Sequence, residues 1–430
     1  MSSQNAIPRP ALIVSLDRSD ASVAVALLEV ATGAWSEQTV STAPEVLAEW
    51  WRQLRATHPE HDLLVAFEQP APNLLAFFAP RQPAAIYALN PSATWAYRQS
   101  LAVSHARTDQ SDARHQALFI RNHRHELTAW QPVPATVSVL DRLNQGRRKL
   151  VDQRVGLTNR LQATLKRHYP QALDLMHEDI WRPMNLAFLR RWPNPAALQA
   201  SRLSTVKAFF HRHGSRSERR WQERAALLRA LVPLAAAEAD LTAEEFEVAV
   251  VVDQIEVLNQ SISRYEQEIA RRFAPEDPAD IVRTLPGAGP LLAPRLWVAL
   301  ARFAEYCDSA DQLATAVGVA PVTDQSGKAR RVHRRLRCSK HTQQTFVEWA
   351  KEAALQSVWS KQFMARRKAQ GHGFFASLRA LAYKWLRILW KCWREKTPYD
   401  ETRYLLLLRA KGSPLVPPEW LPPAPQTLST

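Results

Sequence analysis

The amino-acid sequence predicts an α/β domain at the N-terminus, then a helical region with a coiled-coil pattern, then a mostly α-helical domain. Up to about residue 135, short apolar runs that end in polar residues alternate with helical patterns. From about Leu140, apolar residues recur at helical spacing over two long segments. From Ile281 onward the chain again reads as helices, now rich in tryptophan. The predicted bounds are 1–135, 136–278 and 279–400, followed by a partly disordered tail at 401–430.

The N-terminal segments alternate as strands and helices. The opening ALIVSLDRSDASVAVALLEV predicts a strand, a polar turn and a second strand, and its first run is almost wholly apolar, as in a buried central strand. DLLVAFE and PAAIYALN predict two more strands, with a helix through Trp50 and Trp51 before them. A later helix carries Asp109 and Asp112. In this α/β order, ligands are expected at the carboxyl ends of the strands.

The middle region contains two long helical patterns. In the first, Leu143, Leu150 and Leu157 recur every seven residues. The second has an unbroken seam of steps of three and four: Val248, Val251, Ile255, Leu258, Ile262, Tyr265 and Ile269. We expect the two helices to form an antiparallel coiled coil, which could also serve dimerisation. An ordinary amphipathic helix packed in a globular core is the alternative.

Composition narrows the partner and the compartment. The formal net charge of +15 and a pI near 10.1 favour nucleic acid as partner, although a membrane surface would also attract such a chain. No apolar run approaches the ~20 residues of a spanning helix, and the first residues lack a signal peptide's pattern. The three cysteines form no CxxC pair, which argues against disulfides and a zinc site. We expect a cytoplasmic, nucleoid-associated protein.

Two C-terminal patterns concern DNA contact. TLPGAGP, with Gly287 and Gly289, resembles the turn of a helix-hairpin-helix, whose backbone amides can face a phosphate. A simple packing corner between helices explains the turn nearly as well. Between Lys328 and Lys340, seven of thirteen residues are Lys or Arg, which favours phosphate contacts over a merely solvated loop.

The final helices combine tryptophans with a basic stripe. Trp349, Trp359, Trp385, Trp390 and Trp393 are expected in the core rather than as stacking platforms for bases. Four cations recur at helical spacing and should form one stripe: Lys384, Arg387, Lys391 and Arg394.

Four carboxylates stand where a catalytic metal site could form. Asp17 and Glu68 close two predicted strands, and Asp109 and Asp112 share one helix face. Together they would repel one another strongly, and Mg²⁺ or Mn²⁺ would relieve this because both prefer oxygen ligands. Two such ions about 4 Å apart could stabilise the attacking and leaving oxygens in phosphodiester chemistry.

Each carboxylate also has a simpler interpretation. Asp109 and Asp112, after an N-cap at Thr108, would merely complement the helix dipole. Asp17 could start a turn, and Glu68 could be an exposed strand end. The joint placement of all four favours the metal site.

These motifs together resemble the DEDD transposases of bridge-RNA insertion sequences, a group that includes the site-specific pilin-gene invertases. The matching motifs are SLDRSD, AFEQP, ALNPSATWAY and RTDQSDA, followed by LPGAGP, LATAVGVAPVTDQSGK, the basic run and LRALAYKWLRILW. They run in the same order over about residues 11–400. The resemblance implies a RuvC-like, RNase H-type N-terminal domain and a C-terminal transposase domain.

Carried over residue by residue, the family's catalytic and metal-binding acidic tetrad falls on Asp17, Glu68, Asp109 and Asp112, and its serine nucleophile falls on Ser326. The resemblance implies an RNA-guided, site-specific DNA recombinase that forms a covalent phosphoserine intermediate with Mg²⁺ or Mn²⁺. Its partners would be double-stranded donor and target DNA, a structured bridge RNA, and further copies of the chain, as a dimer or tetramer with composite active sites. The residues expected to contact nucleic acid are Gly287, Gly289, Gly327, Lys328, Arg330, Arg331, Arg334, Arg335, Arg337 and Lys340.

Three other functions compete with this one. A nuclease of the junction-resolvase type would use water in place of Ser326. A scaffold with a degenerate RNase H-like domain would bind nucleic acid without cutting it. An actin-like ATPase is disfavoured, because it needs Gly-rich phosphate loops and the first 140 residues contain only Gly33.

Overall fold

The computed structural model describes residues 10–69, 71–101, 108–176, 179–233, 238–277, 279–327, 329–336 and 338–420 of the 430-residue chain. The chain divides into two compact units, Met1–Pro132 and Val133–Thr430. Each unit is described by itself. Among the described residues, no helix has the length and the apolar character that crossing a membrane requires.

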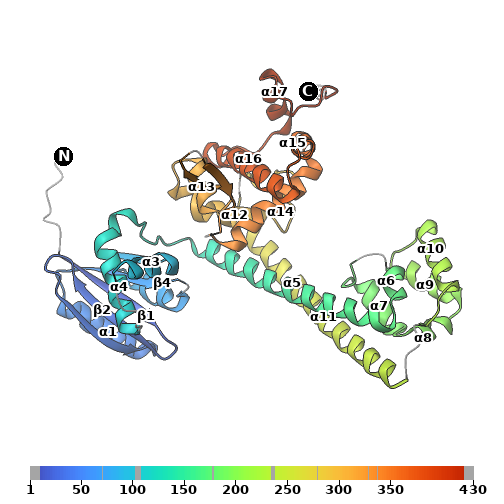
Figure 1. Cartoon of the computed structure of the whole chain (residues 1–430), viewed down its shortest axis with the longest axis horizontal. Coiled ribbons are helices and arrows are strands. Elements are labelled where there is room, and N and C mark those ends of the chain that lie inside the picture. The colour runs from blue at the N-terminus through green and yellow to red at the C-terminus, as the bar shows by residue number, and fades with distance from the viewer. Residues whose placement is uncertain are drawn as a thin grey trace. The chain divides into compact units, whose positions relative to one another are not determined.

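The first unit is a mixed α/β domain built on one five-stranded sheet (Figure 1). The strands are β1 (Ala11–Arg18), β2 (Ser22–Glu29), β3 (Trp35–Ser41), β4 (Asp62–Glu68) and β5 (Ala85–Leu89). Their order is β3-β2-β1-β4-β5, with β1, β4 and β5 parallel and β2 antiparallel to both of its neighbours. The predicted α/β class and the opening strand–turn–strand are confirmed.

Strand β3 is absent from the sequence-based prediction. Its sequence, WSEQTVS, is polar, and Val40 is its only buried residue. As an edge strand exposed to water on most positions, it lacks the apolar pattern by which buried strands are found.

Helices cover both faces of this sheet. Alternate residues of β1 point to opposite faces, so Leu12, Val14 and Leu16 pack with α1 (Pro44–Thr57) and α2 (Pro72–Phe78). The other face packs against α4 (Asp109–His123), and alanines on both sides of this contact allow the helix to approach closely. The remaining elements are α3 (Pro91–Leu101) and the short 3₁₀ helices η1 (Ala79–Arg81) and η2 (Arg124–Glu126).

Two long helices, α5 (Ala135–His168) and α11 (Glu238–Phe273), lie side by side in the second unit (Figure 1). Ion pairs join Arg147 to Glu266 at 2.6 Å and Arg160 to Glu247 at 2.8 Å. Residue numbers therefore increase along one helix where they decrease along the other, so the two helices are antiparallel. The predicted antiparallel pairing is therefore found, while the coiled coil itself stays a prediction. Five of the predicted seam residues are buried, namely Val248, Val251, Ile255, Ile262 and Ile269, and Leu258 and Tyr265 are half-buried.

Five short helices follow α5 and form a separate core with the adjoining part of the long pair. They are α6 (Gln171–Met176), α7 (Pro183–Arg191), α8 (Pro195–Gln199), α9 (Leu203–Arg212) and α10 (Glu218–Arg229). Phe188 and Phe210 stack at the centre, with ring centroids 5.7 Å apart.

The C-terminal part of this unit is also mostly helical. It contains α12 (Ala293–Phe303), η3 (Ala304–Tyr306), α13 (Ala310–Ala316), α14 (Lys340–Gln356), α15 (Val358–Ala369), α16 (Phe374–Glu395) and α17 (Glu401–Ala410). Trp349, Trp359 and Trp385 are fully buried, which confirms their predicted place in the core, and Trp390 and Trp393 are half-buried. In the described part of the tail, Leu405 and Leu415 are buried against the same core.

The predicted basic stripe lies on α16. Arg387, Lys391 and Arg394 are exposed, whereas Lys384 is half-buried and burial lowers its pKa. All three cysteines are free; Cys307 and Cys392 are buried, and Cys338 is half-buried.

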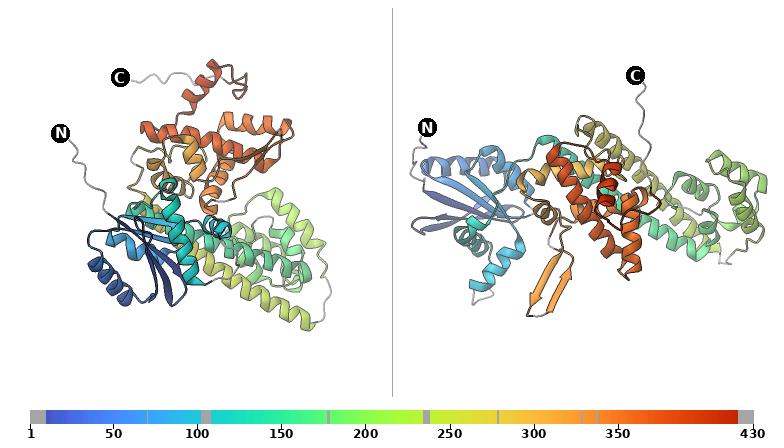
Figure 2. Two further views of the ribbon diagram at one scale, coloured as in Figure 1. Left: turned by 60° about the vertical axis from the view of Figure 1, so that its left-hand side comes forward. Right: turned by 90° about the horizontal axis from the view of Figure 1, so that it is seen from above.

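A two-stranded hairpin, β6 (Val322–Ser326) and β7 (Ala329–His333), stands out from these helices, drawn in orange in the right-hand view of Figure 2. Within the two strands, every residue except Val322 is exposed. Since neither strand has a buried face, the sequence shows only a basic polar run and gives no apolar alternation to identify it.

Candidate active site

The ends of two parallel strands bring Asp17 and Glu68 together. Leu16 on β1 lies beside Phe67 on β4, so the following residues, Asp17 and Glu68, are neighbours at the carboxyl ends of both strands. Successive residues of a strand point to opposite faces of the sheet, and Asp17 points to the same face as Ile13, which packs against α4. Glu68 points to this face as well. The two carboxylates therefore lie on the face of the sheet that α4 covers.

Helix α4 begins beside these strand ends with Asp109 and Asp112 in its first turn. Thr108 is the N-cap, and its side-chain oxygen accepts a hydrogen bond from the amide of Ser111 at 3.1 Å. The Ser111 hydroxyl completes the capping box with the Thr108 backbone. Because Thr108 and Ser111 cap the helix, neither aspartate is needed for that role.

The pKa of Asp17 responds both to burial and to the three other carboxylates. This pKa is raised from its ordinary 3.8 to about 6. Burial is the largest cause, and the negative charges of Asp112, Glu68 and Asp109 contribute the rest of the increase. A hydrogen bond from Gln116 acts in the opposite direction. The four residues of the predicted tetrad thus form a loose cluster, in which Asp17, Glu68 and Asp112 are half-buried and Asp109 is exposed.

Three polar side chains that the sequence-based prediction missed hold this cluster. Gln116 on α4 donates from Nε2 to Asp17 Oδ1 at 3.1 Å and accepts from the Ser15 hydroxyl at 3.3 Å. Thr94 on α3 donates to Glu68. Arg98, one turn further along α3, donates from Nη1 to Asp112 Oδ1 at 2.6 Å.

These three residues are almost wholly buried. Thr94 and Arg98 are separated by four positions, so they share one face of α3. A buried arginine one turn after a buried threonine has no sequence signature, since arginine at such positions is usually exposed.

The cluster suits a hard divalent cation in its chemistry but is not arranged around one. Its donors are carboxylate oxygens, the ligands that Mg²⁺ and Mn²⁺ prefer, and a cation there would relieve the repulsion felt by Asp17. Within the described ranges, no three His, Cys, Asp or Glu side chains are already grouped as metal ligands. The guanidinium of Arg98 is instead the cation that pairs with Asp112.

Ser326 lies at the end of β6, next to the turn of the exposed hairpin. Strand register pairs Ser326 with Ala329, Asp324 with Arg331, and Gln325 with Arg330. Paired residues in a hairpin point to the same face and successive residues alternate, so Ser326 shares its face with Arg331, while Arg330 lies on the other.

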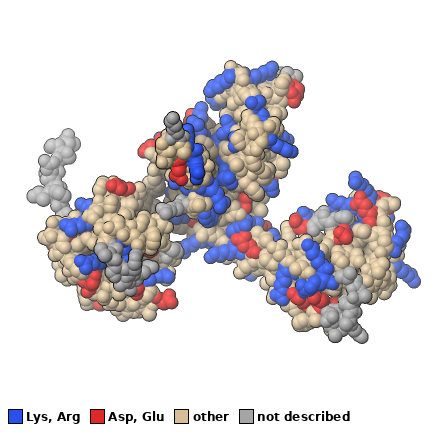
Figure 3. All heavy atoms as spheres, in the orientation of Figure 1, with Lys and Arg blue, Asp and Glu red and all other residues tan. Residues whose placement is uncertain are grey.

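The other predicted nucleic-acid contacts vary in exposure. Arg330, Arg331 and Arg334 are exposed, Arg335 is half-buried, and Lys340 donates from Nζ to the Leu336 carbonyl at 2.8 Å. Gly327 has φ +56 in open space, a turn conformation that favours glycine. Lys328 and Arg337 lie outside the described residues. In Figure 3, Lys and Arg gather over the part of the surface formed by the C-terminal elements.

In the turn expected to face a phosphate, the contacts of Gly287 favour the packing-corner alternative. Residues 281–292 form successive turns before α12, and α11 ends at Phe273, so no helix leads directly into this turn in the described residues. The amide of Gly287 already donates to Gln356 Oε1 at 2.8 Å, and a Cβ at this position would lie 2.5 Å from the Ala353 amide nitrogen of α14. Gly287 therefore serves close packing, as in the packing-corner alternative. Gly289 is exposed, with open space around it.

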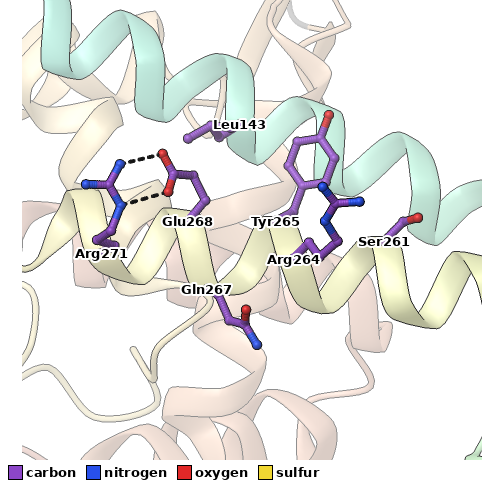
Figure 4. Close-up of a pocket in the computed structure, with 7 residues that line it drawn as sticks. All are labelled: Leu143, Ser261, Arg264, Tyr265, Gln267, Glu268 and Arg271. Carbon is purple, nitrogen blue, oxygen red and sulfur yellow. Dashed lines mark hydrogen bonds and ion pairs between the residues drawn. The ribbon is translucent and has the colours of Figure 1, made fainter.

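A hollow of about 690 Å³ lies along α5 and α11 (Figure 4). Three charged residues line it, Arg264, Glu268 and Arg271, and the last two are paired with each other at 2.8 Å. The ring of Tyr265 lies close to Gly146 of α5, where a Cβ would come within 2.8 Å of it. This hollow results from helix packing and holds no cluster of acids or nucleophile-base pair comparable to the cluster around Asp17.

Comparisons with known proteins match both parts of the chain to transposases. Residues 14–170 match a family model described as "Transposase", built on the DEDD transposases of IS110. Residues 279–365 match a second model, described as "Transposase IS116/IS110/IS902 family". Together the two matches cover more than half of the chain, including all four carboxylates and Ser326.

Two curated relatives cover most of the chain. A protein of Streptomyces coelicolor named "Mini-circle putative transposase for IS117" is 25% identical over 330 residues, which are 74% of this chain and 78% of the relative. A protein of Streptomyces clavuligerus, named as an uncharacterized 44.8 kDa protein of insertion element IS116, is 27% identical over 294 residues, 67% of this chain and 72% of the relative.

Proposed function

We propose that this chain, an insertion-sequence transposase of the IS116/IS110/IS902 family, is an RNA-guided, site-specific DNA recombinase. In this proposal, Ser326 is its nucleophile. The carboxylates of Asp17, Glu68, Asp109 and Asp112 would form its metal-binding site. The mixed five-stranded sheet that carries them is consistent with a RuvC-like, RNase H-type domain.

The observation that carries the proposal is the position of Ser326. It lies at the end of an exposed hairpin, within the residues that match the second transposase model, and Arg331 shares its face. A backbone phosphate approaching Ser326 would therefore meet a cation on the same side. An extended hairpin that buries nothing has little value for the stability of the domain, which favours a role in contact with DNA.

In the proposed step, the Ser326 hydroxyl loses its proton and its Oγ forms a bond to a backbone phosphorus atom. One bridging P–O bond of the DNA breaks, and the sugar oxygen that leaves takes up a proton. Rejoining is the reverse step, in which a sugar hydroxyl attacks the phosphoserine. The bond energy is conserved in the phosphoserine, so strand exchange needs no nucleotide cofactor.

The tetrad would hold Mg²⁺ or Mn²⁺, which supplies Lewis-acid stabilisation of the phosphoryl oxygens. Thr94 and Gln116 would keep the carboxylates of Glu68 and Asp17 in place. Arg98 would have to share or release Asp112 when a cation binds.

The test of the nucleophile is a covalent trap. We expect the wild-type protein to become linked to a nicked suicide DNA substrate, and Ser326→Ala to lose both the adduct and strand cleavage while DNA binding stays within about twofold. Thr323→Ala, on the opposite face of the same hairpin, is the matched control and should retain the adduct. Full cleavage by Ser326→Ala would refute the serine mechanism and favour attack by water, as in a junction resolvase.

Arg331 and Arg330 provide a second matched pair. Removing a phosphate contact in the transition state lowers the rate of the chemical step, so we expect Arg331→Ala to reduce adduct formation by about 10²-fold or more. Arg330→Ala should weaken DNA binding with a much smaller effect on the adduct. Equal effects of the two changes would contradict the role assigned to Arg331.

The guide RNA and the oligomer are tested separately. A structured RNA should copurify with the protein and contain matches to the DNA that flanks the gene. For the oligomer, we expect a mixture of inactive Ser326→Ala and Asp109→Ala proteins to regain activity if each site draws residues from two copies. No recovery in the mixture would contradict sites shared between subunits.

A further inference from the structure

The first turn of α16 exposes two adjacent aromatic rings. Phe374 and Phe375 have exposed fractions of 56% and 68%, and their ring centroids are 5.5 Å apart in an edge-to-face arrangement. They follow the sequence RRKAQGHG, so three cations and a histidine precede them within ten residues. We call residues 366–375 the aromatic-basic loop; they comprise the end of α15, the connecting turn and the start of α16.

This loop lies in an unusually basic stretch of the chain. Residues 353–394 contain nine Lys or Arg and no Asp or Glu. Arg366 and Lys368 are exposed at the end of α15, and Arg379, one turn after Phe375 on α16, is half-buried. Among the described residues, none of these three cations forms an ion pair with a carboxylate.

The combination of bare rings and unpaired cations identifies the kind of partner. Apolar side chains alone would suit another protein, and cations alone would suit any polyanion. Single-stranded nucleic acid satisfies both, because its unpaired bases offer flat faces for stacking and its backbone offers phosphates at short intervals. In duplex DNA the base faces are already stacked and are not available to the phenyl rings.

We propose that the aromatic-basic loop binds an unpaired DNA strand, with bases stacked on Phe374 and Phe375 and phosphates held by Arg366 and Lys368. Strand exchange by a transposase exposes such unpaired DNA. The loop lies outside the residues 279–365 that match the second transposase model and begins 40 residues after Ser326. It is therefore a binding site in addition to the proposed active site.

A second copy of the chain is a poor occupant of the same surface. A symmetric contact would place the two basic loops against each other, and the stretch has no acidic residue to compensate. The resulting repulsion between like charges would oppose the burial of the rings.

The test measures binding of the full-length protein in the Ser326→Ala background, so that it is independent of cleavage. A labelled 20-nucleotide single strand of DNA, the matching duplex and the same strand as RNA are compared by fluorescence anisotropy. We expect Phe374→Ala/Phe375→Ala to weaken binding of single-stranded DNA by about 10- to 100-fold and binding of the duplex by less than about twofold. Phe374→Tyr/Phe375→Tyr keeps both rings and should bind as the parent does.

Leu406→Ala/Leu407→Ala is the control for loss of exposed apolar surface, since these leucines are 45% and 50% exposed on α17. It should leave all three affinities unchanged. A single strand containing 5-bromodeoxyuridine should also crosslink to residues 366–375 under ultraviolet light, as mapped by mass spectrometry.

Several results would overturn the proposal. Unchanged affinity of the Ala variant for single-stranded DNA would show that the rings do not stack on bases, and an equal loss for duplex would show a general effect. A loss confined to RNA would assign the loop to a different strand. A change in sedimentation without a change in affinity would identify the loop as a contact between copies.

Discussion

Asp17→Asn should stabilise the metal-free protein at neutral pH. The pKa of Asp17 rises from 3.8 to about 6 through burial and the neighbouring carboxylates, and each pH unit corresponds to 1.36 kcal/mol, so the ionised carboxylate costs at most about 3 kcal/mol. Water reaches the half-buried side chain and screens part of this, and we expect about 1–2 kcal/mol. Asparagine removes the charge, and its oxygen can still accept the hydrogen bond from Gln116.

The pH dependence gives this prediction its sign. Below about pH 4 the carboxyl is protonated in both the folded and unfolded protein, so wild type and Asp17→Asn should be equally stable. Between about pH 4 and 6 the unfolded chain loses the proton while the folded chain keeps it, so the wild type loses stability relative to the variant. Above about pH 6 the full difference is present.

The assay is calorimetric unfolding of the full-length protein in EDTA, following the transition of the first unit. At pH 7 we expect Asp17→Asn to raise its Tm by about 3–8 °C, and at pH 4 to leave it unchanged. Adding Mg²⁺ should stabilise the wild type and not the variant. Exposed Asp20→Asn is the control. A lower or unchanged Tm for Asp17→Asn at pH 7 would refute the electrostatic strain inferred for the cluster.

Three further predictions follow from the packing of particular residues. Gly287→Ala should destabilise the second unit by about 2–4 kcal/mol in urea titrations, because φ is +75 and the new Cβ would press on the α14 backbone. The control Gly289→Ala should cost less than about 1 kcal/mol. Similar values for both variants would contradict the close-packing role of Gly287. Arg98→Met should lower the free energy of unfolding in EDTA by about 2–4 kcal/mol, since Asp112 loses its buried partner. Added Mg²⁺ should raise the free energy of unfolding of this variant by more than it raises that of the wild type. An equal increase in both proteins would refute this prediction. At pH 8 we expect Cys338 to react quickly with Ellman's reagent and the other two cysteines to react slowly. Cys307 and Cys392 are buried, and burial raises the pKa of Cys392 to about 11. Fast reaction in Cys338→Ser would count against this.

Local sequence pattern was sufficient where burial has a simple period. This pattern predicted the burial of most residues in three places: the apolar runs of β1 and β4, the seam of α11, and the tryptophans of the C-terminal helices. The same pattern predicted that Asp17 and Glu68 close two strands, and the structure made these strands neighbours. It failed at β3 and at the β6–β7 hairpin, because neither has a buried face to impose alternation.

The sequence by itself pointed to four carboxylates, at strand ends and at a helix start, as a candidate metal site. Its resemblance to a known family pointed to Ser326, the serine before the dense run of arginines. The tertiary structure decided what surrounds them. It placed Thr94, Arg98 and Gln116 against the carboxylates, gave the amide of Gly287 to Gln356, and put Arg331 rather than Arg330 on the face of Ser326. These contacts depend on strand register and helix packing between distant segments, and spacing along the chain carries no record of them.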